Sequence, residues 1–216
     1  MKSILVIGLG RFGRHVIMKL ADMDHEVMAV DTDEERVNAI LKYATYAQIG
    51  DSTDEEFLMS LGVRNFDACI VTIGDNFQAS LEITSNLKEL GAKYIIAKVA
   101  SELQSKFLLM AGANEIVYPE KDIAEKVAVK CNTANLLDYI EVSSDYNIVE
   151  IKVPTDWIGK SLTTLNIRKK YNLNILAVSN NGIVTMPDGD YMFKEEDCLF
   201  IFGETNMVEK LIKKEI

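Results

Sequence analysis

The stretch Gly8-Leu9-Gly10-Arg11-Phe12-Gly13 decides how the first part of the chain is expected to fold. It follows the apolar run Ser3–Ile7 directly and opens the amphipathic stretch Arg11–Ala21, so the glycines lie between a strand and a helix. A second apolar run ends at Asp31, 18 residues after Gly13. This is the context of a dinucleotide-binding βαβ unit. Its first glycine permits a tight turn, its second lets the backbone approach a diphosphate, and its third lets the helix pack close to the sheet.

The alternation of apolar runs and amphipathic stretches continues from this motif to about residue 135. It predicts strands at Ser3–Ile7, Glu26–Asp31, Thr45–Ile49, Ala68–Ile73, Tyr94–Val99 and Glu115–Tyr118. It predicts helices at Arg11–Ala21, Asp33–Lys42, Thr53–Leu61, Asn76–Leu90, Ser101–Ala111 and Pro119–Thr133. Strands that alternate with helices and are almost wholly apolar indicate an α/β fold, with a Rossmann-like, doubly wound parallel sheet covered on both faces.

The pattern changes near residue 135, where strands become more frequent than helices. It predicts strands at Asp138–Val142, Tyr146–Val153, Asn174–Val178, Gly182–Thr185 and Cys198–Phe202, and helices at Ser161–Lys170 and Thr205–Lys214. We therefore expect two domains: residues 1–135, which carry the nucleotide-binding motif, and residues 136–216, a smaller α+β domain.

The composition excludes several classes of function. The 216 residues include 33 Asp and Glu against 23 Lys and Arg, which gives a net charge of -10. This balance argues against nonspecific nucleic-acid binding and against docking on an anionic lipid surface. The cysteines Cys69, Cys131 and Cys198 are too far apart for a zinc motif, and their odd number defines no disulfide framework. We expect a reduced, cytoplasmic protein.

Two charged residues near the glycines suggest which ligand binds. Asp31 ends the second strand, where a carboxylate accepts hydrogen bonds from ribose hydroxyls and disfavours a 2′-phosphate. Adenosine ligands or NAD are therefore expected rather than NADP. Arg11 stands at a helix N-terminus, where a cation opposes the helix dipole unless an anion offsets it. We predict that Arg11 contacts a phosphate; the alternative is a solvated residue of the first turn.

Further candidates stand at the carboxyl ends of the other parallel strands, where ligands of such sheets bind. Asp51-Ser52-Thr53 is expected to line the adenine, although Thr53 suits a helix N-cap equally well. Lys98 is either a phosphate contact or a surface lysine, and Glu120 by itself reads as an acid that complements a helix dipole. The predicted cofactor-binding residues are Gly8, Gly10, Arg11, Phe12, Gly13, Asp31, Thr32, Asp51, Ser52, Thr53, Gly74, Asn76, Lys98 and Glu120.

The sequence provides no recognisable catalytic machinery. Tyr94 and Lys98 match the Tyr-x-x-x-Lys spacing of short-chain dehydrogenases, but that pair needs a helix, and the residues between them predict a strand. No nucleophile–base pair or cluster of metal ligands is visible. A nucleotide-binding domain without chemistry suggests a sensor rather than an enzyme, in which occupancy selects between conformations.

Several dispersed motifs resemble one family. Glu26-Val27-Met28-Ala29-Val30-Asp31, Ile49-Gly50-Asp51-Ser52-Thr53-Asp54 and Tyr118-Pro119-Glu120-Lys121-Asp122, together with the glycine motif, resemble the RCK N-domain, which regulates potassium conductance. Ile167-Arg168-Lys169-Lys170-Tyr171 and Glu195-Glu196-Asp197-Cys198 resemble the RCK C-domain. The chain is most similar to the regulatory subunits of Trk/Ktr-type potassium uptake systems, in particular to the Ktr branch.

The resemblance implies a nonenzymatic, ligand-gated subunit that binds ATP and ADP in competition. It implies dimers that assemble into a homo-octameric ring on the cytoplasmic face of a separate membrane-embedded potassium transporter subunit. Asp31 would hold the ribose, Gly10 to Gly13 the phosphates, and Arg11 the terminal phosphate. Glu120 matches a family acid near the γ-phosphate that helps to bind a divalent or sodium cation.

Two alternatives and one further ligand remain open. Relatives of the Trk type sense NAD(H), with which Asp31 is equally compatible, and an NAD-dependent oxidoreductase is the alternative from another class. In some Ktr-type relatives the C-domain dimer binds cyclic di-AMP. The residues near that pattern are Ile167, Arg168, Asn174, Ile175 and Pro187, which would otherwise be strand core and turn.

Overall fold

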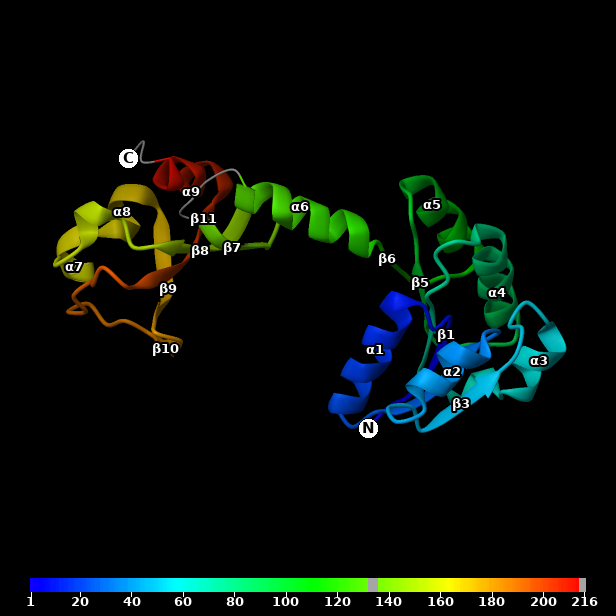
Figure 1. Cartoon of the computed structure of the whole chain (residues 1–216). Helices are drawn as coiled ribbons and strands as arrows, with labels where there is room; N and C mark the ends of the chain where they lie inside the picture. The colour runs from blue at the N-terminus through cyan, green and yellow to red at the C-terminus, as the bar shows by residue number, and fades with distance from the viewer. Residues whose placement is uncertain (132–135, 214–216) are drawn as a thin grey trace. The chain divides into compact units, whose positions relative to one another are not determined.

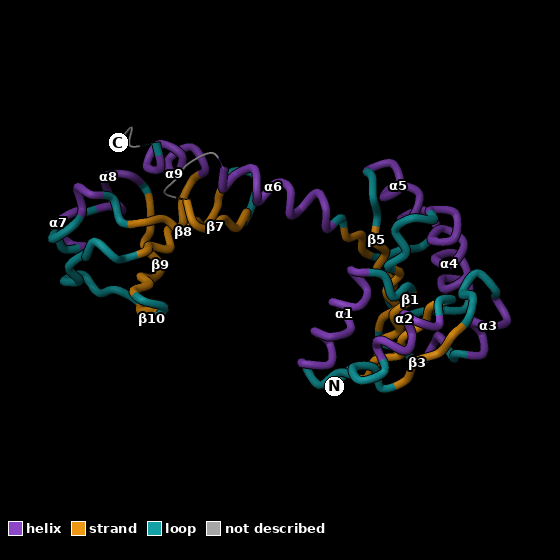
Figure 2. Tube along the Cα trace, in the orientation of Figure 1, coloured by secondary structure: helices purple, strands orange, loops and turns teal. Residues whose placement is uncertain are grey.

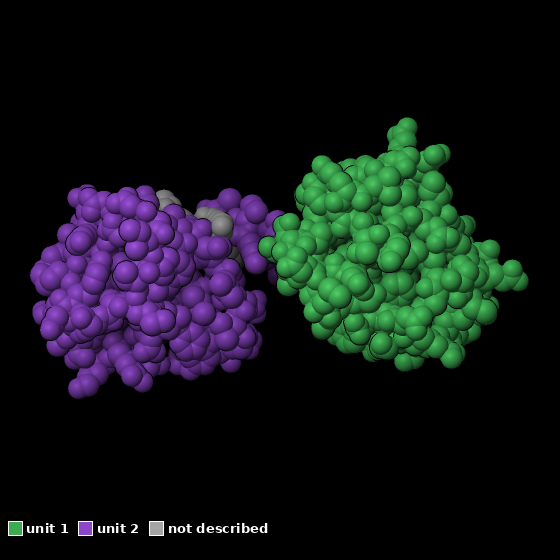
Figure 3. Space-filling model, turned by 90° about the horizontal axis from the view of Figure 1, so that it is seen from below, with its two compact units in different colours: residues 1–120 green, residues 121–216 purple. Residues whose placement is uncertain are grey.

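A computed structural model describes residues 1–131 and 136–213, and the chain divides into two compact units. The first unit is Met1–Glu120 and the second is Lys121–Ile216, as the two colours of Figure 3 show. Each unit has its own sheet and its own apolar core. None of the helices in the described ranges is long and apolar enough to cross a membrane.

The first unit is built on a six-stranded parallel sheet in the order β3-β2-β1-β4-β5-β6. Figure 1 labels β1, β3, β5 and β6 of this sheet. Its strands are β1 (Ser3–Ile7), β2 (Glu26–Asp31), β3 (Tyr46–Ile49), β4 (Ala68–Val71), β5 (Ile95–Lys98) and β6 (Glu115–Val117). Its helices are α1 (Arg11–Asp22), α2 (Glu34–Ile40), α3 (Glu55–Ser60), the short 3-10 helix η1 (Val63–Asn65), α4 (Phe77–Glu89) and α5 (Glu102–Ala111).

The central strand β1 explains why this sheet is covered on both faces. Leu5 and Ile7 belong to one core cluster and Ile4 and Val6 to another, and all four are at most 5% exposed. Helices α1 and α2 contribute to the cluster of Ile4 and Val6, whereas α3, α4 and α5 contribute to the other. Successive side chains of a strand point to opposite faces, so an unbroken apolar run requires helices on both. This arrangement confirms the predicted doubly wound fold.

The strand order also creates a crevice at one edge of the sheet. Strand β1 pairs with β2 on one side and with β4 on the other, so the chain winds away from β1 in both directions. The connections that leave the carboxyl ends of these strands diverge at this point, which is where open α/β sheets bind ligands. Figure 2 shows the loops that gather beside β1.

One predicted helix start in this unit is wrong. Helix α3 begins at Glu55 and its N-cap is Asp54, whose Oδ1 accepts a hydrogen bond from the backbone N–H of Glu56 at 2.9 Å. Thr53 is therefore not the cap. Its hydroxyl and its backbone N–H both donate to Asp51 Oδ1, at 2.7 and 2.9 Å.

The division into units differs from the predicted domain boundary by the length of one helix. Helix α6 (Pro119–Cys131) covers the described part of the predicted helix to Thr133, and residues 132–135 lie outside the described ranges. The unit boundary falls after Glu120, near the start of α6, whereas the sequence places it after residue 135. Ala128 and Cys131 near the end of α6 line a cavity together with residues of β7, β8 and α9.

The second unit contains a five-stranded antiparallel sheet in the order β10-β9-β11-β8-β7. Its strands are β7 (Leu136–Glu141), β8 (Tyr146–Lys152), β9 (Leu173–Asn180), β10 (Ile183–Thr185) and β11 (Cys198–Glu204). Besides α6, its helices are the 3-10 helix η2 (Thr155–Trp157), α7 (Leu162–Leu165), α8 (Ile167–Tyr171) and α9 (Thr205–Ile212). The predicted α+β domain is confirmed.

The predicted single helix Ser161–Lys170 is wrong, because two short helices occupy this stretch. Asn166 separates α7 from α8 with a φ of 49°, and Asn172 ends α8 with a φ of 55°. Asparagine adopts this left-handed conformation more readily than other residues with a side chain. The break turns Leu165 and Ile167, on its two sides, into the same core cluster.

Candidate functional site

A pocket of about 530 Å³ lies at the carboxyl edge of the parallel sheet, where the chain order diverges from β1. Its walls come from the connections that follow β1, β2, β3 and β4. Ten of the residues predicted from the sequence line this one pocket: Gly8, Gly10, Arg11, Asp31, Thr32, Asp51, Ser52, Thr53, Gly74 and Asn76. Segments far apart in the sequence thus meet at the switch point of the sheet.

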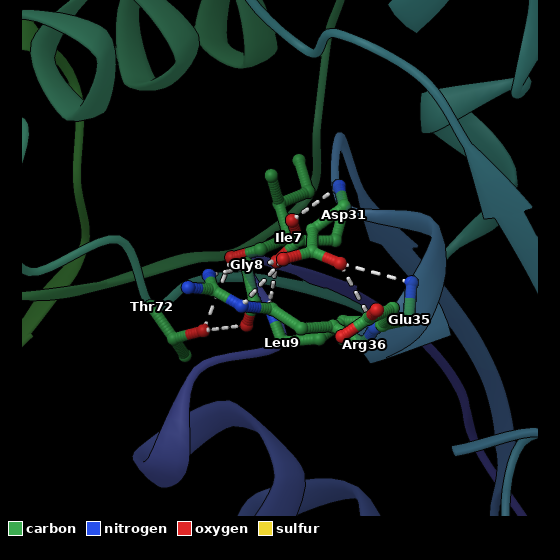
Figure 4. A network of polar contacts seen from close by, with 8 residues as sticks. Ile7, Gly8, Leu9, Asp31, Glu35, Arg36 and Thr72 are labelled. Carbon is green, nitrogen blue, oxygen red and sulfur yellow. Dashed lines mark hydrogen bonds and ion pairs between the residues drawn. The ribbon is translucent and has the colours of Figure 1, made fainter. Parts of the chain in front are cut away.

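The glycine turn is fixed by a close contact between α1 and β4. Gly8 has a φ of 94°, and a Cβ on Gly13 would lie 2.1 Å from the Gly8 carbonyl oxygen. The Thr72 hydroxyl donates to that same carbonyl and to the Ile7 carbonyl (Figure 4). The turn therefore has no room for side chains at these two positions, and its shape does not depend on a ligand.

The N-terminus of α1 points an unsatisfied positive end towards the pocket. Gly10 is the N-cap, no side chain caps the helix, and its first turn contains no acidic residue. The space beside Gly10 is open, since a Cβ there would meet nothing within 4 Å. The exposed Arg11 adds a full positive charge at this point. Free backbone N–H groups and a helix dipole favour an anion, and a phosphate group fits both.

Asp31 lies beside the glycine turn and is only 8% exposed. Its Oδ2 accepts a hydrogen bond from the Leu9 backbone N–H at 2.6 Å (Figure 4). Its Oδ1 accepts one from the Asp33 N–H at 2.9 Å. Arg36 stands beside it, with 3.7 Å between a guanidinium nitrogen and Asp31 Oδ2. A carboxylate has about four acceptor positions, so Asp31 can still accept hydrogen bonds from hydroxyl groups in the pocket.

The third wall carries a buried hydroxyl group without a partner. Ser52 is 4% exposed and its Oγ has no hydrogen-bond partner among the described residues. Next to it, the backbone N–H and the hydroxyl of Thr53 hold the pKa of Asp51 below its ordinary value. Asp51 is thus an ionised acceptor at the pocket wall, and Ser52 Oγ is available to a ligand.

A salt bridge lies beyond Gly74. Lys98 Nζ is 2.8 Å from Glu120 Oε1, and a Cβ on Gly74 would come within 3.2 Å of the same nitrogen. The hydrogen bond from Lys98 is the main reason why the pKa of Glu120 is lowered, and the charges of Lys98 and Arg11 lower it further. Lys98, Glu120 and Arg11 therefore form one electrostatic group at the end of the pocket near α1.

Four predicted residues are not among those that line the pocket: Phe12, Gly13, Lys98 and Glu120. Conversely, the polar residues Arg36 and Thr72 line the pocket but were not predicted from the sequence. Arg36 stands five residues after Asp31 in the next helix, and its charge at that spacing is a signal that could have revealed it. Thr72 offers no such signal, because its contact with the glycine turn depends on the pairing of β1 with β4.

The residues predicted for cyclic di-AMP differ in their accessibility. Ile167 is 2% exposed and packs in the core of the second unit, whereas Arg168 is exposed. Asn174, Ile175 and Pro187 are half-buried, and Ile175 packs against the same core. Within one chain, Ile167 has no free face on which a base could stack.

The described residues support neither a metal-binding cluster nor the Tyr–Lys pair of a short-chain dehydrogenase. No cluster of three or more His, Cys, Asp or Glu side chains in the described ranges would hold a metal ion by itself. Lys98 ends strand β5, and the Tyr94 hydroxyl donates to Glu115 at 2.9 Å. The Tyr-x-x-x-Lys spacing therefore ends in a strand, as predicted, and not on a helix.

Comparison with known proteins gives two family matches that together span most of the chain. Residues 4–119 match the TrkA-N domain and residues 148–215 match the TrkA-C domain. A Ktr system potassium uptake protein C of Bacillus subtilis (strain 168) is 41% identical over 214 residues, which are 99% of this chain and 97% of the relative. The Ktr system potassium uptake protein A of the same strain is 42% identical over 210 residues, 97% of this chain and 95% of that protein.

Solved structures show the same fold at low identity. The GsuK channel is 23% identical with a TM-score of 0.72, over 97% of this chain and 38% of the channel chain. The GsuK channel bound to NAD is 24% identical with a TM-score of 0.70, over 98% of this chain and 39% of that chain. This chain thus spans well under half the length of those channel chains, and the likeness concerns the fold.

Proposed function

The chain belongs to the family of Ktr system potassium uptake proteins, whose TrkA-N and TrkA-C domains it carries, and we propose that it is a regulatory subunit that binds ATP and ADP. In this proposal it gates a separate membrane-embedded potassium transporter subunit from the cytoplasmic side. It catalyses no reaction of its own, and nucleotide occupancy selects between its conformations.

One observation carries the proposal: a single pocket combines an uncapped helix N-terminus with a buried carboxylate at the end of the neighbouring strand β2. The N-terminus of α1 suits the phosphates, and Asp31 suits the ribose hydroxyls. In the connection that follows β3, Asp51 provides an acceptor for an adenine edge, and the unpartnered Ser52 Oγ provides a hydroxyl. An adenosine nucleotide satisfies all of these groups at once.

The group of Arg11, Lys98 and Glu120 is where ATP would differ from ADP. A γ-phosphate adds negative charge that Arg11 and Lys98 neutralise, and ADP lacks that charge. Glu120 is one carboxylate and cannot bind a cation alone, but it fits a cation that takes its other ligands from phosphate oxygens. Such a site gains affinity from a divalent or sodium cation only when ATP is present.

Self-assembly is the second part of the proposal. Helix α5 exposes several apolar side chains, among them Leu103 at 66%, Leu109 at 50% and Met110 at 75%. A cluster of exposed apolar side chains suits a contact with another protein surface. We propose that the chain forms homodimers that assemble into an octameric ring, and that this ring transmits the nucleotide state to the transporter subunit.

Calorimetric titration of nucleotide-stripped protein tests the proposal, with the oligomer mass measured in the same samples. We expect saturable binding of ATP and ADP to one site per chain, in an octamer. Preference for NADH with weak ATP binding would replace the proposal by a redox sensor of the Trk type. Hydride transfer to NAD in a spectrophotometric screen of substrates would favour an oxidoreductase instead. Cyclic di-AMP is included as a separate titrant, because its binding to the second unit stays a prediction.

A further inference from the structure

The second unit contains a cavity to which no ligand has been assigned. It has a volume of about 470 Å³ and lies between the end of α6, strands β7 and β8 and helix α9. Its walls are mainly apolar and include Leu136, Val149, Val208 and Ile212. A volume of this size, with mainly apolar walls, is typical of sites that bind small molecules.

One buried side-chain oxygen in this cavity, Asn147 Oδ1, lacks a hydrogen-bond partner among the described residues. The inward face of β8 is formed by Asn147, Val149 and Ile151, all at most 2% exposed. The Asn147 side chain donates to Thr205 Oγ1 at 3.4 Å and also to the hydroxyl oxygen of Tyr139, which lines the same cavity. Its Oδ1 has no partner within the described part of the chain. A buried acceptor without a donor destabilises the fold, so an Asn in this row of apolar residues calls for a ligand.

The mouth of the cavity limits the charge of that ligand. Glu209 and Lys213 stand one turn apart on α9 and line the cavity, and their charged groups are 3.5 Å apart. Both side chains are about half exposed, at 53% and 45%. Because the two opposite charges are paired with each other, the rim offers no net charge to attract an ion.

We propose that this cavity binds an uncharged, mainly apolar small molecule that donates one N–H or O–H hydrogen bond to Asn147 Oδ1. The apolar walls hold the body of the ligand through the hydrophobic effect, and the orphan oxygen fixes its orientation. Water is a poor occupant by comparison. A single water molecule would fill only a small part of the 470 Å³, and the apolar walls would stay exposed to solvent. The site is separate from the nucleotide pocket and does not depend on the function proposed for that pocket.

N-phenyl-1-naphthylamine is a suitable probe, because it is uncharged and apolar, has a single N–H donor, and fluoresces more strongly in apolar surroundings. Its control is 1-benzylnaphthalene, in which a CH₂ group replaces the N–H. We expect the full chain to bind one N-phenyl-1-naphthylamine, with 1-benzylnaphthalene about fivefold weaker in competition because it lacks the hydrogen bond. In Asn147→Leu the two compounds should bind equally.

Two matched variants on α6 test whether the probe binds in this cavity. Ala128→Trp puts a large ring into the cavity from the exposed end of the helix and should reduce probe affinity at least about tenfold. Ala124→Trp stands one turn earlier, outside the cavity, and should leave the affinity unchanged. Bound probe should also slow alkylation of Cys131, the exposed cysteine of the cavity wall.

Circular dichroism reports whether each variant is folded, because Ala128→Trp and Ala124→Trp add a second tryptophan beside Trp157 of the same unit. Absence of saturable probe binding to the folded protein would overturn the proposal. So would binding that Ala128→Trp leaves unchanged, since the probe then sits elsewhere. Equal affinity of the two compounds for the unmodified chain would remove the role of Asn147, and with it the stated ligand chemistry.

Discussion

The two units each contain a hollow with an unpartnered buried polar atom, but the hollows are built from different kinds of sheet. In the first unit the pocket lies beyond the ends of parallel strands, and Ser52 Oγ is the unpartnered atom. In the second unit the cavity lies on the face of an antiparallel sheet beneath α9, and Asn147 Oδ1 is the unpartnered atom. The first hollow has charged residues on its walls, whereas the second is mainly apolar.

The difference shows where selectivity comes from in each case. At the ends of parallel strands, backbone N–H groups and a helix dipole are directed at one point. A pocket there favours a negatively charged ligand through its backbone alone, without a contribution from side chains. A cavity on a sheet face has no free backbone groups, and its selectivity depends on side-chain volume and on one amide. Variants that act on the backbone should therefore affect the first unit only.

Gly13→Ala is expected to have the largest effect. Its Cβ would lie 2.1 Å from the Gly8 carbonyl oxygen and 2.6 Å from Thr72 Oγ1, so α1 must move away from the sheet. We expect a loss of about 3 kcal/mol in the free energy of unfolding of the first unit. The second unit should be unaffected, and Trp157, the single tryptophan, reports on it alone.

Urea unfolding followed by circular dichroism and by Trp157 fluorescence separates the two units. Circular dichroism should show an earlier transition in Gly13→Ala, with an unchanged fluorescence midpoint. Gly10→Ala is the matched control, since a Cβ there meets nothing within 4 Å and the stability should hardly change. A fluorescence midpoint that shifts with Gly13→Ala would show that the units do not unfold independently.

Asp31→Ala sharpens the comparison at the level of binding. Loss of a charged acceptor for the ribose should weaken ATP and ADP by about 10- to 100-fold, as measured by calorimetry. Binding of N-phenyl-1-naphthylamine in the second unit should not change. Glu34→Ala is the control, because Glu34 is an exposed acid of the neighbouring helix α2 and does not line the pocket. If nucleotide affinity survives Asp31→Ala, the ribose lies elsewhere.

The same comparison explains how much could be predicted from the sequence. The alternation of apolar runs and the glycine motif predict the parallel sheet and most of its pocket, because backbone geometry leaves a local pattern. Asn166 breaks a predicted helix through one left-handed residue, which periodicity does not show. Thr72 and Asn147 matter only because β1 pairs with β4 and α9 covers β8. Such contacts between distant segments have no local sequence signal.

Arg11→Ala tests whether the charged end of the pocket distinguishes ATP from ADP. We expect ATP to lose about tenfold in affinity and ADP much less, because only ATP brings a γ-phosphate to this group. Arg14→Ala removes an exposed cation from the same helix, outside the pocket, and should change neither affinity. Calorimetry with both nucleotides measures the ratio. Equal losses for ATP and ADP would place Arg11 at the α- or β-phosphate.

The smallest expected effect is the pH dependence of the Lys98–Glu120 pair. The folded state lowers the pKa of Glu120, mainly through the Lys98 hydrogen bond, so the pair stabilises the fold above the ordinary carboxyl value of 4.5. This contribution is lost as the pH falls through the lowered pKa of the folded state. Because the Glu120 side chain is 61% exposed, solvent limits the contribution to about 0.3 kcal/mol. The measurement is the free energy of unfolding of the unmodified chain and of Glu120→Gln at about pH 7 and about pH 3, on either side of this titration. The two proteins should differ slightly at neutral pH and converge in acid. A difference that grows in acid would mean that Glu120 is held in its protonated form. It would contradict the pairing with Lys98, on which the site proposed for the γ-phosphate depends.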